Sequence, residues 1–480
     1  MNWIGRCTHR NEYDAVLWLY DQGKTAELLC DDLAVHVNTV QRMKDEPQEE
    51  YTGFNSQNGK KREKTSSCKR IGKPGFEEMC TMRHCRVTVI FLVICTVISL
   101  GSISSAEEGV ILPEQVLAAG NPDQVFEQGN RTSMNGLSVV NLHGSWYEMG
   151  RQYGALMRDE LNEVHLFVES IIEYSYGNAE KAESIISVQT AQTPYRVSEF
   201  LRGASETSGL TVRQLQAVNA VERIGGLPKC GAAFCWGEYA AGPLVIGRNY
   251  DYSDAFALLK DDVAITVYHP ADGSLAVATI GYVGEIYAVN GFNEKGIFME
   301  LNNGKPSANI KSPDNRVTGT TMLFSALFEV DELEDWDLFF NTVNCSSSYI
   351  INVADSEEAI SYEWCPIGVK HGGTDQPEGL LVSTNYFVNP DWLFATPSDA
   401  ASWEGLTRRS NLIALCEASK GQIDDRKMLE IIGTALEDGG AMNELTVFQM
   451  VMIPETGMLW LRVIGGSGWT QIDLSGFLLN

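Results

Sequence analysis

The sequence has few cysteines and few basic residues, and each of these two shortages excludes a class of protein. Its 11 cysteines in 480 residues are too few for a fold built on disulfide bonds. Lys and Arg total 36 against 63 Asp and Glu, a formal net charge of -27. This argues against a general nucleic-acid-binding protein, because phosphate contacts need clustered positive charge. CxxC-type zinc spacing is absent, and we expect neither a metal nor a cofactor.

What the sequence does contain is typical of a folded soluble protein. Hydrophobic residues make up 44% and charged residues 21% of the chain. A length of 480 residues exceeds one ordinary hydrophobic core, so two or more regions are expected.

The composition of the chain first changes at residues 87–106, which contain no charged residue. Arg83 and Arg86 precede it and small residues end it, which is typical of a secretory signal beginning at Met82. Its strictly apolar part is shorter than the roughly 20 residues that a spanning helix needs. The alternative is an uncleaved membrane anchor, with the basic run 60–73 on the cytoplasmic side. Both interpretations of 82–106 place the rest of the chain outside the cytoplasm, secreted, periplasmic or anchored.

The extension 1–81 has the rhythm of helix, glycine turn and helix, which is similar to a helix-turn-helix module. Asp31 and Asp32 weaken a DNA-binding interpretation. The alternatives are an amphipathic stretch of no special role and a mis-assigned start of the chain.

Residues 107–229 have a mostly helical pattern, with Thr211 and Gln214 at the spacing of a capping box. We expect a helical layer or pro-segment there, which would form a small subunit. From residue 230 the pattern changes to short β-rich runs split by turn residues, with helical patterns at about 319–342 and 405–438. Residues 447–463 predict a terminal hairpin. This grouping predicts an α+β fold of packed layers over 230–480.

Cys230 and Cys235 lie in the first of these β-rich runs. Side chains alternate faces along a strand, and an odd spacing directs these two thiols to opposite faces. They are therefore not a metal pair or a disulfide. One can be reactive while the other packs as a small buried hydrophobe.

Several motifs in order resemble a known family. They are "CGAAFC…GRNYDY" at 230–252, "GFNEKGIFMELNN" at 291–303 and "LLVSTN" at 380–385, with "HGSWYEMGRQYGALM" before them and the terminal hairpin after. The set resembles the N-terminal nucleophile hydrolases of the choloylglycine hydrolase and isopenicillin N acyltransferase families, nearer to the acyltransferases, over roughly 139–465. The resemblance implies a four-layer αββα fold, self-cleavage before the nucleophile, and hydrolysis or transfer of the acyl group of linear N-acyl amides.

The same resemblance implies roles for individual residues. Cys230 would be the nucleophile, released by cleavage after Lys229, with its own α-amino group as base and no histidine required. Arg248 would favour the thiolate and Asp251 would hold the α-amine. Their odd spacing would require a bend or bulge near Asn249 for both to line one site.

The resemblance further implies two amide side chains and one more arginine. The acyltransferase spacing selects Asn302 as an oxyanion donor and the choloylglycine spacing selects Asn303; we prefer Asn302. Asn385 matches the second family asparagine, which positions the substrate and the terminal amine. Of the adjacent arginines in "TRRSNL", Arg408 fits the family arginine better than Arg409.

Two alternatives remain open. A Cys–His enzyme could use only His269 or His371 after residue 229, and both have the pattern of solvated loop residues. A non-catalytic binding protein on the same fold is the other. For an enzyme, the expected partner is a small-molecule N-acyl amide, with the pro-segment remaining as a second chain and the membrane contacted only through 87–106. Asn130 and Asn344 begin glycosylation sequons.

Overall fold

The computed structural model describes residues 116–479, except 177–178, 191–192, 221–228, 311–317 and positions 374, 376 and 378. These residues all belong to one of the two units of the chain, Ser105–Asn480. The expectations for 1–81 and 82–106 fall outside the described residues. Within the described ranges, no helix has both the length and the apolar character needed to cross a membrane.

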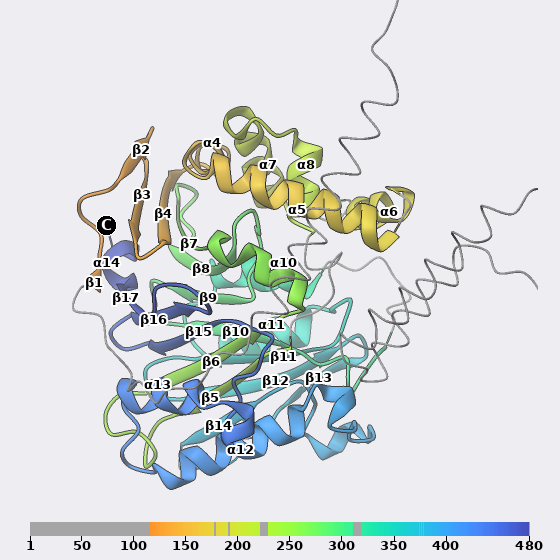
Figure 1. Cartoon of the computed structure of the whole chain (residues 1–480), viewed down its shortest axis with the longest axis vertical. Coiled ribbons are helices and arrows are strands. Elements are labelled where there is room, and N and C mark those ends of the chain that lie inside the picture. The colour runs from red at the N-terminus through yellow and green to blue at the C-terminus, as the bar shows by residue number, and fades with distance from the viewer. Residues whose placement is uncertain are drawn as a thin grey trace, which may run out of the picture. The chain divides into compact units, whose positions relative to one another are not determined.

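The strands form two sheets (Figure 1). The seven-stranded sheet has the order β1 (Val116–Leu117), β17 (Thr470–Asp473), β16 (Met458–Val463), β15 (Thr446–Ile453), β6 (Val245–Asp251), β5 (Gly231–Cys235), β14 (Leu380–Ser383). The ten-stranded sheet has the order β13 (Gly368–His371), β12 (Ala359–Cys365), β11 (Tyr349–Ala354), β10 (Phe298–Asn303), β9 (Asn290–Asn293), β8 (Val277–Tyr282), β7 (Val263–Pro270), β4 (Leu137–Gly144), β3 (Gly129–Met134), β2 (Gln124–Phe126). The pairings are antiparallel except β1 with β17 and β4 with β7, among the described strands.

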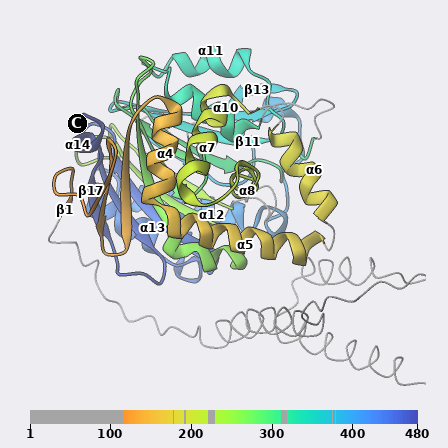
Figure 2. The same ribbon diagram turned by 90° about the horizontal axis from the view of Figure 1, so that it is seen from above.

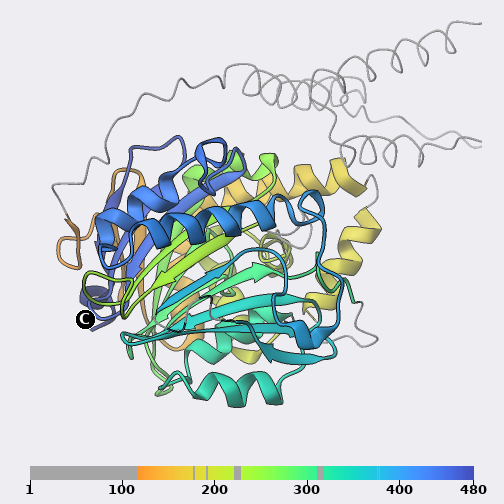
Figure 3. The same cartoon turned by 90° about the horizontal axis from the view of Figure 1, so that it is seen from below.

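Helices pack against both sheets. The α-helices are α4 (Trp146–Leu156), α5 (Arg158–Tyr176), α6 (Ala179–Thr190), α7 (Tyr195–Ser208), α8 (Val212–Val218), α10 (Gly319–Leu327), α11 (Asp335–Thr342), α12 (Gly405–Ala418), α13 (Asp425–Gly433) and α14 (Leu474–Leu478). Short 3-10 turns are η1 (Asp254–Asp262), η2 (Pro390–Trp392), η3 (Ala400–Ser402) and η4 (Leu436–Asp438). Helices α12 and α13 contact β5, β14, β6 and β15, whereas α10 and α11 contact β9 and β13. In Figure 3 the blue helices α12 and α13 and the teal helix α11 lie on opposite sides of the two sheets.

The central strands are buried on both faces, which explains their nearly continuous apolar sequence. Every residue of β5, β6, β10 and β11 is buried. The β-rich runs expected after residue 230 are confirmed as strands, and the terminal hairpin is confirmed as β15 and β16. The α+β class is therefore confirmed at the level of two sheets with helices packed on them.

The mostly helical pattern expected for 107–229 is confirmed from Trp146 onward, but the described beginning of the segment consists of strands. Strands β1–β4 lie between residues 116 and 144, because alternating and β-branched residues there extend the edges of both sheets. Helices follow from Trp146, and the expected capping box of Thr211 and Gln214 is present at α8. The segment thus shares sheet hydrogen bonds with the rest of the unit.

Helices α4 and α7 of this segment cross at very short range (Figure 2). A Cβ on Gly150 would lie 2.0 Å from the Phe200 carbonyl oxygen, and one on Gly203 would lie 2.0 Å from that of Tyr147. Glycine is required at both positions because only its missing side chain allows the two backbones to approach this closely.

Candidate active site

The candidate nucleophile Cys230 lies directly before strand β5, which runs antiparallel to β6 on one side and to β14 on the other. Continuing these registers by one and two residues places Cys230 between Tyr250 and Asn385. Its side chain is fully buried and belongs to the apolar cluster that includes Ala232 and Phe234. Cys230 therefore faces the ten-stranded sheet.

A polar row lies beside Cys230 on the same face. Ser383, Ala232 and Arg248 are aligned across β14, β5 and β6. From β10 of the other sheet, Asn302 accepts a hydrogen bond from the Arg248 guanidinium at 2.9 Å and donates one to the Ser383 hydroxyl at 2.8 Å. The small side chain of Ala232 separates the two contacts, so Asn302 joins the two sheets next to the thiol.

Glu300 is a site residue that sequence reasoning missed. It forms an ion pair with Arg248, and both side chains are completely buried. Asn352, opposite Glu300 on β11, donates to the same carboxylate. The available signal was a single charged residue in the apolar run Phe298–Leu301, two positions before Asn302. Removing only one partner of such a buried ion pair strongly destabilises a protein, because the other charge is then buried without compensation.

Asp251 lies on the opposite face of β6 from Arg248. Its carboxylate accepts hydrogen bonds from Thr446 at 2.7 Å, Asn443 at 3.1 Å and Arg408 at 3.2 Å. Burial raises the pKa of the Asp251 carboxyl above its ordinary range, and these donors offset part of the rise. Thr446 and Asn443 were also missed, since nothing in sequence links a residue near 250 to one near 445.

An irregularity does lie next to Asn249, on the partner strand. The register of β6 with β5 is regular from Val245 up to Asn249, where it ends, and the pairing of β6 with β15 is irregular between Thr446 and Phe448, opposite Asp251 and Tyr250. Arg248 bonds to Asn302 of the other sheet and Asp251 to Arg408 of α12, so the two side chains point to opposite sides of the sheet as their odd spacing dictates. They flank the start of β5 from two sides instead of lining one surface.

Arg408 connects the Asp251 side to Cys230. It is fully buried on the face of α12 that repeats every four residues through Leu412 and Cys416. Its Nη1 donates to the carbonyl oxygens of Lys229 at 3.1 Å and Cys230 at 3.2 Å, and its Nη2 donates to the Asn385 side chain at 2.9 Å. The structure thus joins Cys230, Asp251, Asn385 and Arg408 through one guanidinium.

The two expected amide donors differ in what they already bind. The Asn302 amide nitrogen donates to both Glu300 and Ser383, which uses its two hydrogens. The Asn385 amide nitrogen donates to one carbonyl, that of Asn303, at 3.2 Å. Of the two side chains, Asn385 is therefore the one with donor capacity near Cys230.

The side chains of the alternatives Asn303 and Arg409 lie outside this set of contacts. The Asn303 side chain accepts from the Lys305 amide at 3.0 Å, and its nitrogen has no hydrogen-bond partner among the described residues. Arg409 pairs with Asp375 and donates to the Val382 carbonyl. Asn302 and Arg408 are the members of each pair that the structure brings to Arg248 and Cys230.

The two histidines are not loop residues, which corrects that expectation. His269 lies in β7, stacks on His143 at 4.3 Å and contacts the Asn141 side chain at 2.8 Å. Burial, with a smaller contribution from His143, lowers the pKa of His269 to about 4. His371 ends the edge strand β13 and contacts Asp337 at 3.0 Å. Each histidine is thus accounted for by contacts within the ten-stranded sheet and its helices.

Cys235 faces α12, opposite to Cys230, as the odd spacing predicts. It belongs to a second apolar cluster, and its Sγ lies 3.8 Å from the Sγ of Cys416. The hydrogen bond with Cys416, together with burial, raises the pKa of the Cys235 thiol well above its ordinary value. Cys235 is therefore a poor nucleophile.

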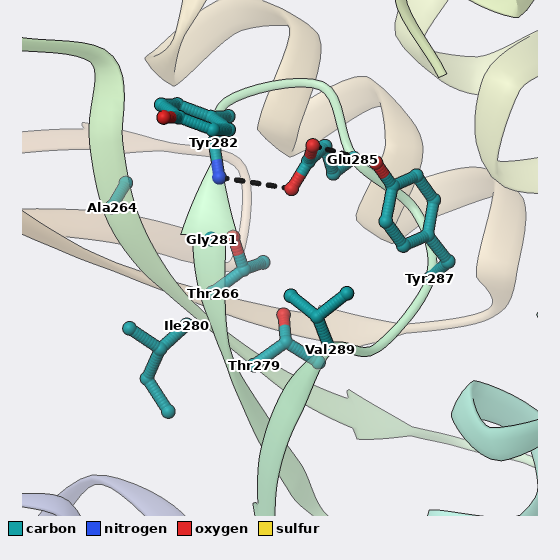
Figure 4. Close-up of a pocket in the computed structure, with 9 residues that line it drawn as sticks. All are labelled: Ala264, Thr266, Thr279, Ile280, Gly281, Tyr282, Glu285, Tyr287 and Val289. Atoms are coloured by element: carbon teal, nitrogen blue, oxygen red, sulfur yellow. Dashed lines mark hydrogen bonds between the residues drawn. The ribbon is translucent and has the colours of Figure 1, made fainter. Parts of the chain in front are cut away.

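A small cavity of about 10 Å³, the size of one water molecule, lies among β7, β8 and the residues that follow β8 (Figure 4). Glu285 at its edge accepts hydrogen bonds from the Tyr287 hydroxyl at 2.6 Å and the Tyr282 amide at 3.0 Å. The cavity is too small for an organic substrate. In the part of the chain that the structure describes, no group of three or more His, Cys, Asp or Glu could hold a metal ion.

No family model and no curated protein matches the sequence. The structure is similar to solved structures of an N-acylethanolamine-hydrolyzing acid amidase ortholog from Caenorhabditis elegans (21% identity, covering 47% of this chain and 93% of that one, TM-score 0.36) and a mutant conjugated bile acid hydrolase from Clostridium perfringens (15%, 51% and 92%, TM-score 0.36). A penicillin V acylase from Agrobacterium tumefaciens is also similar (9%, 51% and 86%, TM-score 0.31).

Proposed function

We propose that the chain is a cysteine N-terminal nucleophile enzyme that cuts itself before Cys230 and then hydrolyses or transfers the acyl group of linear N-acyl amides. The observation that carries the proposal is the environment of the Lys229–Cys230 peptide. Its carbonyl oxygen accepts a hydrogen bond from the buried Arg408, and the next residue is a buried cysteine at the start of a central strand. In this proposal the two sheets and their outer helices are a four-layer αββα sandwich.

Self-cleavage requires only groups at this peptide and one water. The Cys230 thiol adds to the Lys229 carbonyl carbon, which closes a five-membered ring, while Arg408 stabilises the negative charge on the oxygen. The C–N bond then breaks and the thiol proton passes to the departing nitrogen, leaving a thioester and a free α-amine. Water adds to the thioester and the C–S bond breaks, which yields a Lys229 carboxylate and restores the thiol.

The new α-amine is the base for later turnovers. Its ordinary pKa is about 7.7–8.0 and that of a thiol is about 8.5, so proton transfer between the two groups is nearly balanced. Asp251 and Asn385 lie on the two sides of this terminus, each bonded to Arg408, and they hold the amine in place. The thiol of Cys230 attacks the substrate carbonyl, and the amine first takes the thiol proton and then gives it to the leaving nitrogen.

The neighbouring polar row supports this chemistry. Asn385 donates its remaining amide hydrogen to the oxyanion, while Asn302 uses its own to fix Glu300 and Ser383. Arg248, held by Glu300, places a positive charge on the Cys230 side of the sheet, which favours the thiolate. The choice between hydrolysis and transfer depends on whether water or an amine reaches the acyl-enzyme.

The segment before Cys230 remains bound after cleavage in this proposal. Strands β1 and β4 are hydrogen-bonded to β17 and β7, which follow the cut, and α4–α8 bury a large apolar surface. We also propose that the unit lies outside the cytoplasm, secreted, periplasmic or anchored through 87–106, on the grounds of the signal-like sequence.

Intact mass and N-terminal sequencing of the purified protein test the proposal directly. We expect two associated chains, one beginning at Cys230, and turnover on a panel of bile-acid conjugates, N-acyl amino acids, penicillins and long-chain N-acyl amines. His269→Ala and His371→Ala should retain most activity. An uncut yet active wild type contradicts the self-cleaving mechanism, and a folded, processed histidine variant without activity favours a Cys–His enzyme.

A further inference from the structure

Lys229, the residue before the candidate nucleophile, is held at three points. Its backbone amide donates to the Asp251 carbonyl at 2.7 Å, and its carbonyl accepts from Arg408 at 3.1 Å. Its side-chain ammonium lies 5.5 Å from the centre of the Trp403 ring, within the range of a cation–π interaction. The two hydrogen bonds hold the peptide backbone, and the cation–π interaction depends on the identity of the side chain.

Trp403 has an unusual backbone for this purpose. It and Glu404 have φ angles of 54° and 55°, in the left-handed region that non-glycine residues rarely adopt. This conformation directs the Trp403 ring to Lys229 while its carbonyl oxygen accepts a hydrogen bond from the Arg408 Nε at 3.0 Å. Two consecutive residues in this region are a strain that the surrounding structure maintains, which is common at functional sites.

Trp403 therefore interacts with both the Lys229 side chain and the arginine that binds the Lys229 carbonyl oxygen. Its ring lies within cation–π range of the Lys229 ammonium, and its backbone accepts a hydrogen bond from the guanidinium that donates to the Lys229 carbonyl oxygen. A ring that restrains the Lys229 side chain also restrains the rotation of its carbonyl. The carbonyl must be held in one orientation for the thiol of the next residue to add to it.

We propose that Trp403 is a positioning residue for self-cleavage, which binds the Lys229 side chain and so holds the scissile carbonyl against Arg408. This inference deepens the proposed function and rests on it. The Trp403 ring is a subsite for a cationic residue before the cut, and its contribution ends once Lys229 becomes a chain terminus. Processing and turnover should therefore respond differently to changes at Lys229 and Trp403.

The test follows cleavage of the full chain over time after cell-free synthesis, read by intact mass. Lys229→Ala and Trp403→Leu should each slow cleavage about three- to tenfold, the size of a partly exposed cation–π contact. The double variant should be no slower than either single variant. Lys229→Arg keeps a cation that stacks well on an aromatic ring and should cleave near the wild-type rate.

Two controls separate positioning from a general loss of structure. Lys370→Ala removes a comparable pair, since Lys370 lies 5.3 Å from the Trp392 ring, and it should leave cleavage unchanged. The processed fraction of Lys229→Ala should have the wild-type kcat/KM.

Cleavage of Trp403→Leu or Lys229→Ala at the wild-type rate overturns the inference while leaving the proposed function intact. Additive slowing in the double variant also overturns it, because the two side chains would then act separately. A wild type that is never cut between Lys229 and Cys230 contradicts the proposed function itself.

Discussion

Cys230 and Cys235 lie five residues apart around one strand, and both are buried in apolar clusters, yet the charged groups near them differ. Cys230 faces the other sheet, beside the buried charges of Arg248 and Glu300. Cys235 faces α12 among apolar side chains and contacts only the thiol of Cys416 among the interactions described for it. The comparison teaches that the face of a strand, more than its sequence neighbourhood, decides which charged groups lie near a thiol.

The two arginines nearest Cys230, Arg248 and Arg408, support the same conclusion. Arg248 and Arg408 approach the start of β5 from opposite sides of the seven-stranded sheet, each paired with one buried carboxylate. Cys235 has no such partner among the described residues, and its pKa is raised. The proposed thiolate at Cys230 would have two arginines near it, whereas burial disfavours a thiolate at Cys235.

The largest expected effect separates the two cysteines. Cys230→Ala should abolish both self-cleavage and turnover, because no other group supplies the nucleophile. Cys235→Ala should still be cleaved and active, with a stability loss of about 1–2 kcal/mol from the vacated packing. Intact mass, turnover and thermal unfolding of both variants give the measurement. Loss of activity in a folded Cys235→Ala would contradict the assignment of Cys230 as nucleophile and Cys235 as a packing residue.

The second effect tests the charges beside Cys230. Glu300→Gln leaves the Arg248 guanidinium buried without its anion, and we expect a loss of about 3–5 kcal/mol in the free energy of unfolding. The double variant Arg248→Met with Glu300→Met removes both charges and should be more stable than Glu300→Gln, although inactive. Urea unfolding compares the two. A Glu300→Gln protein as stable as the wild type would show that the pair is not energetically coupled.

The third effect divides the two asparagines. Asn385→Ala removes a proposed oxyanion donor and should lower kcat by about 10²–10³-fold; it also leaves the buried Arg408 without one acceptor and should cost about 1–3 kcal/mol in stability. Asn302→Ala deprives Arg248 and Ser383 of a partner and should mainly cost stability, about 1–3 kcal/mol. Steady-state kinetics and unfolding on the same preparations measure both. The reverse pattern would assign the oxyanion to Asn302.

The smallest expected effect is a pH dependence of stability, and it compares a buried carboxylate that has a cationic partner with one that has none among the interactions described for it. Asp251 has Arg408, whereas Asp262 has acidic neighbours, and burial followed by Glu163, Glu160 and Asp261 raises the pKa of Asp262 to about 7. The folded state then holds a proton that the unfolded carboxyl releases near its ordinary value of 3.8. The contribution to stability is present below pH ~4 and is lost as the pH rises to ~7.

Asp262→Asn should therefore unfold at nearly the wild-type temperature at pH 4 and be the more stable protein above pH 7, by about 1–2 kcal/mol, because solvent screening reduces the effect of the shift. Thermal unfolding from pH 4 to 8 measures the difference between the two proteins. Asp261→Asn, at the exposed neighbour, is the matched control and should change the profile less. Parallel profiles for wild type and Asp262→Asn would contradict the raised pKa.

The sequence alone determined the local features of this protein. Alternating and continuously apolar runs predicted the strands after residue 230, and the odd spacing of Cys230 and Cys235 predicted their opposite faces, because side-chain periodicity is a property of the backbone. The same rule predicted that Arg248 and Asp251 point apart. The irregularity near Asn249 lies on β15 and does not bring both residues to one surface.

The tertiary structure decided which residues meet. Glu300, Thr446 and Asn443 reach Arg248 and Asp251 from strands and loops 52 to 195 positions away, and local patterns carry no information about such pairings. It also placed β1–β4 at the edges of sheets formed by later residues, where an isolated segment would have no partner strand. Arg408 and Arg409 are adjacent in sequence, and only the packing of α12 on β5 turns one of them toward Cys230, because a helix directs successive side chains about 100° apart.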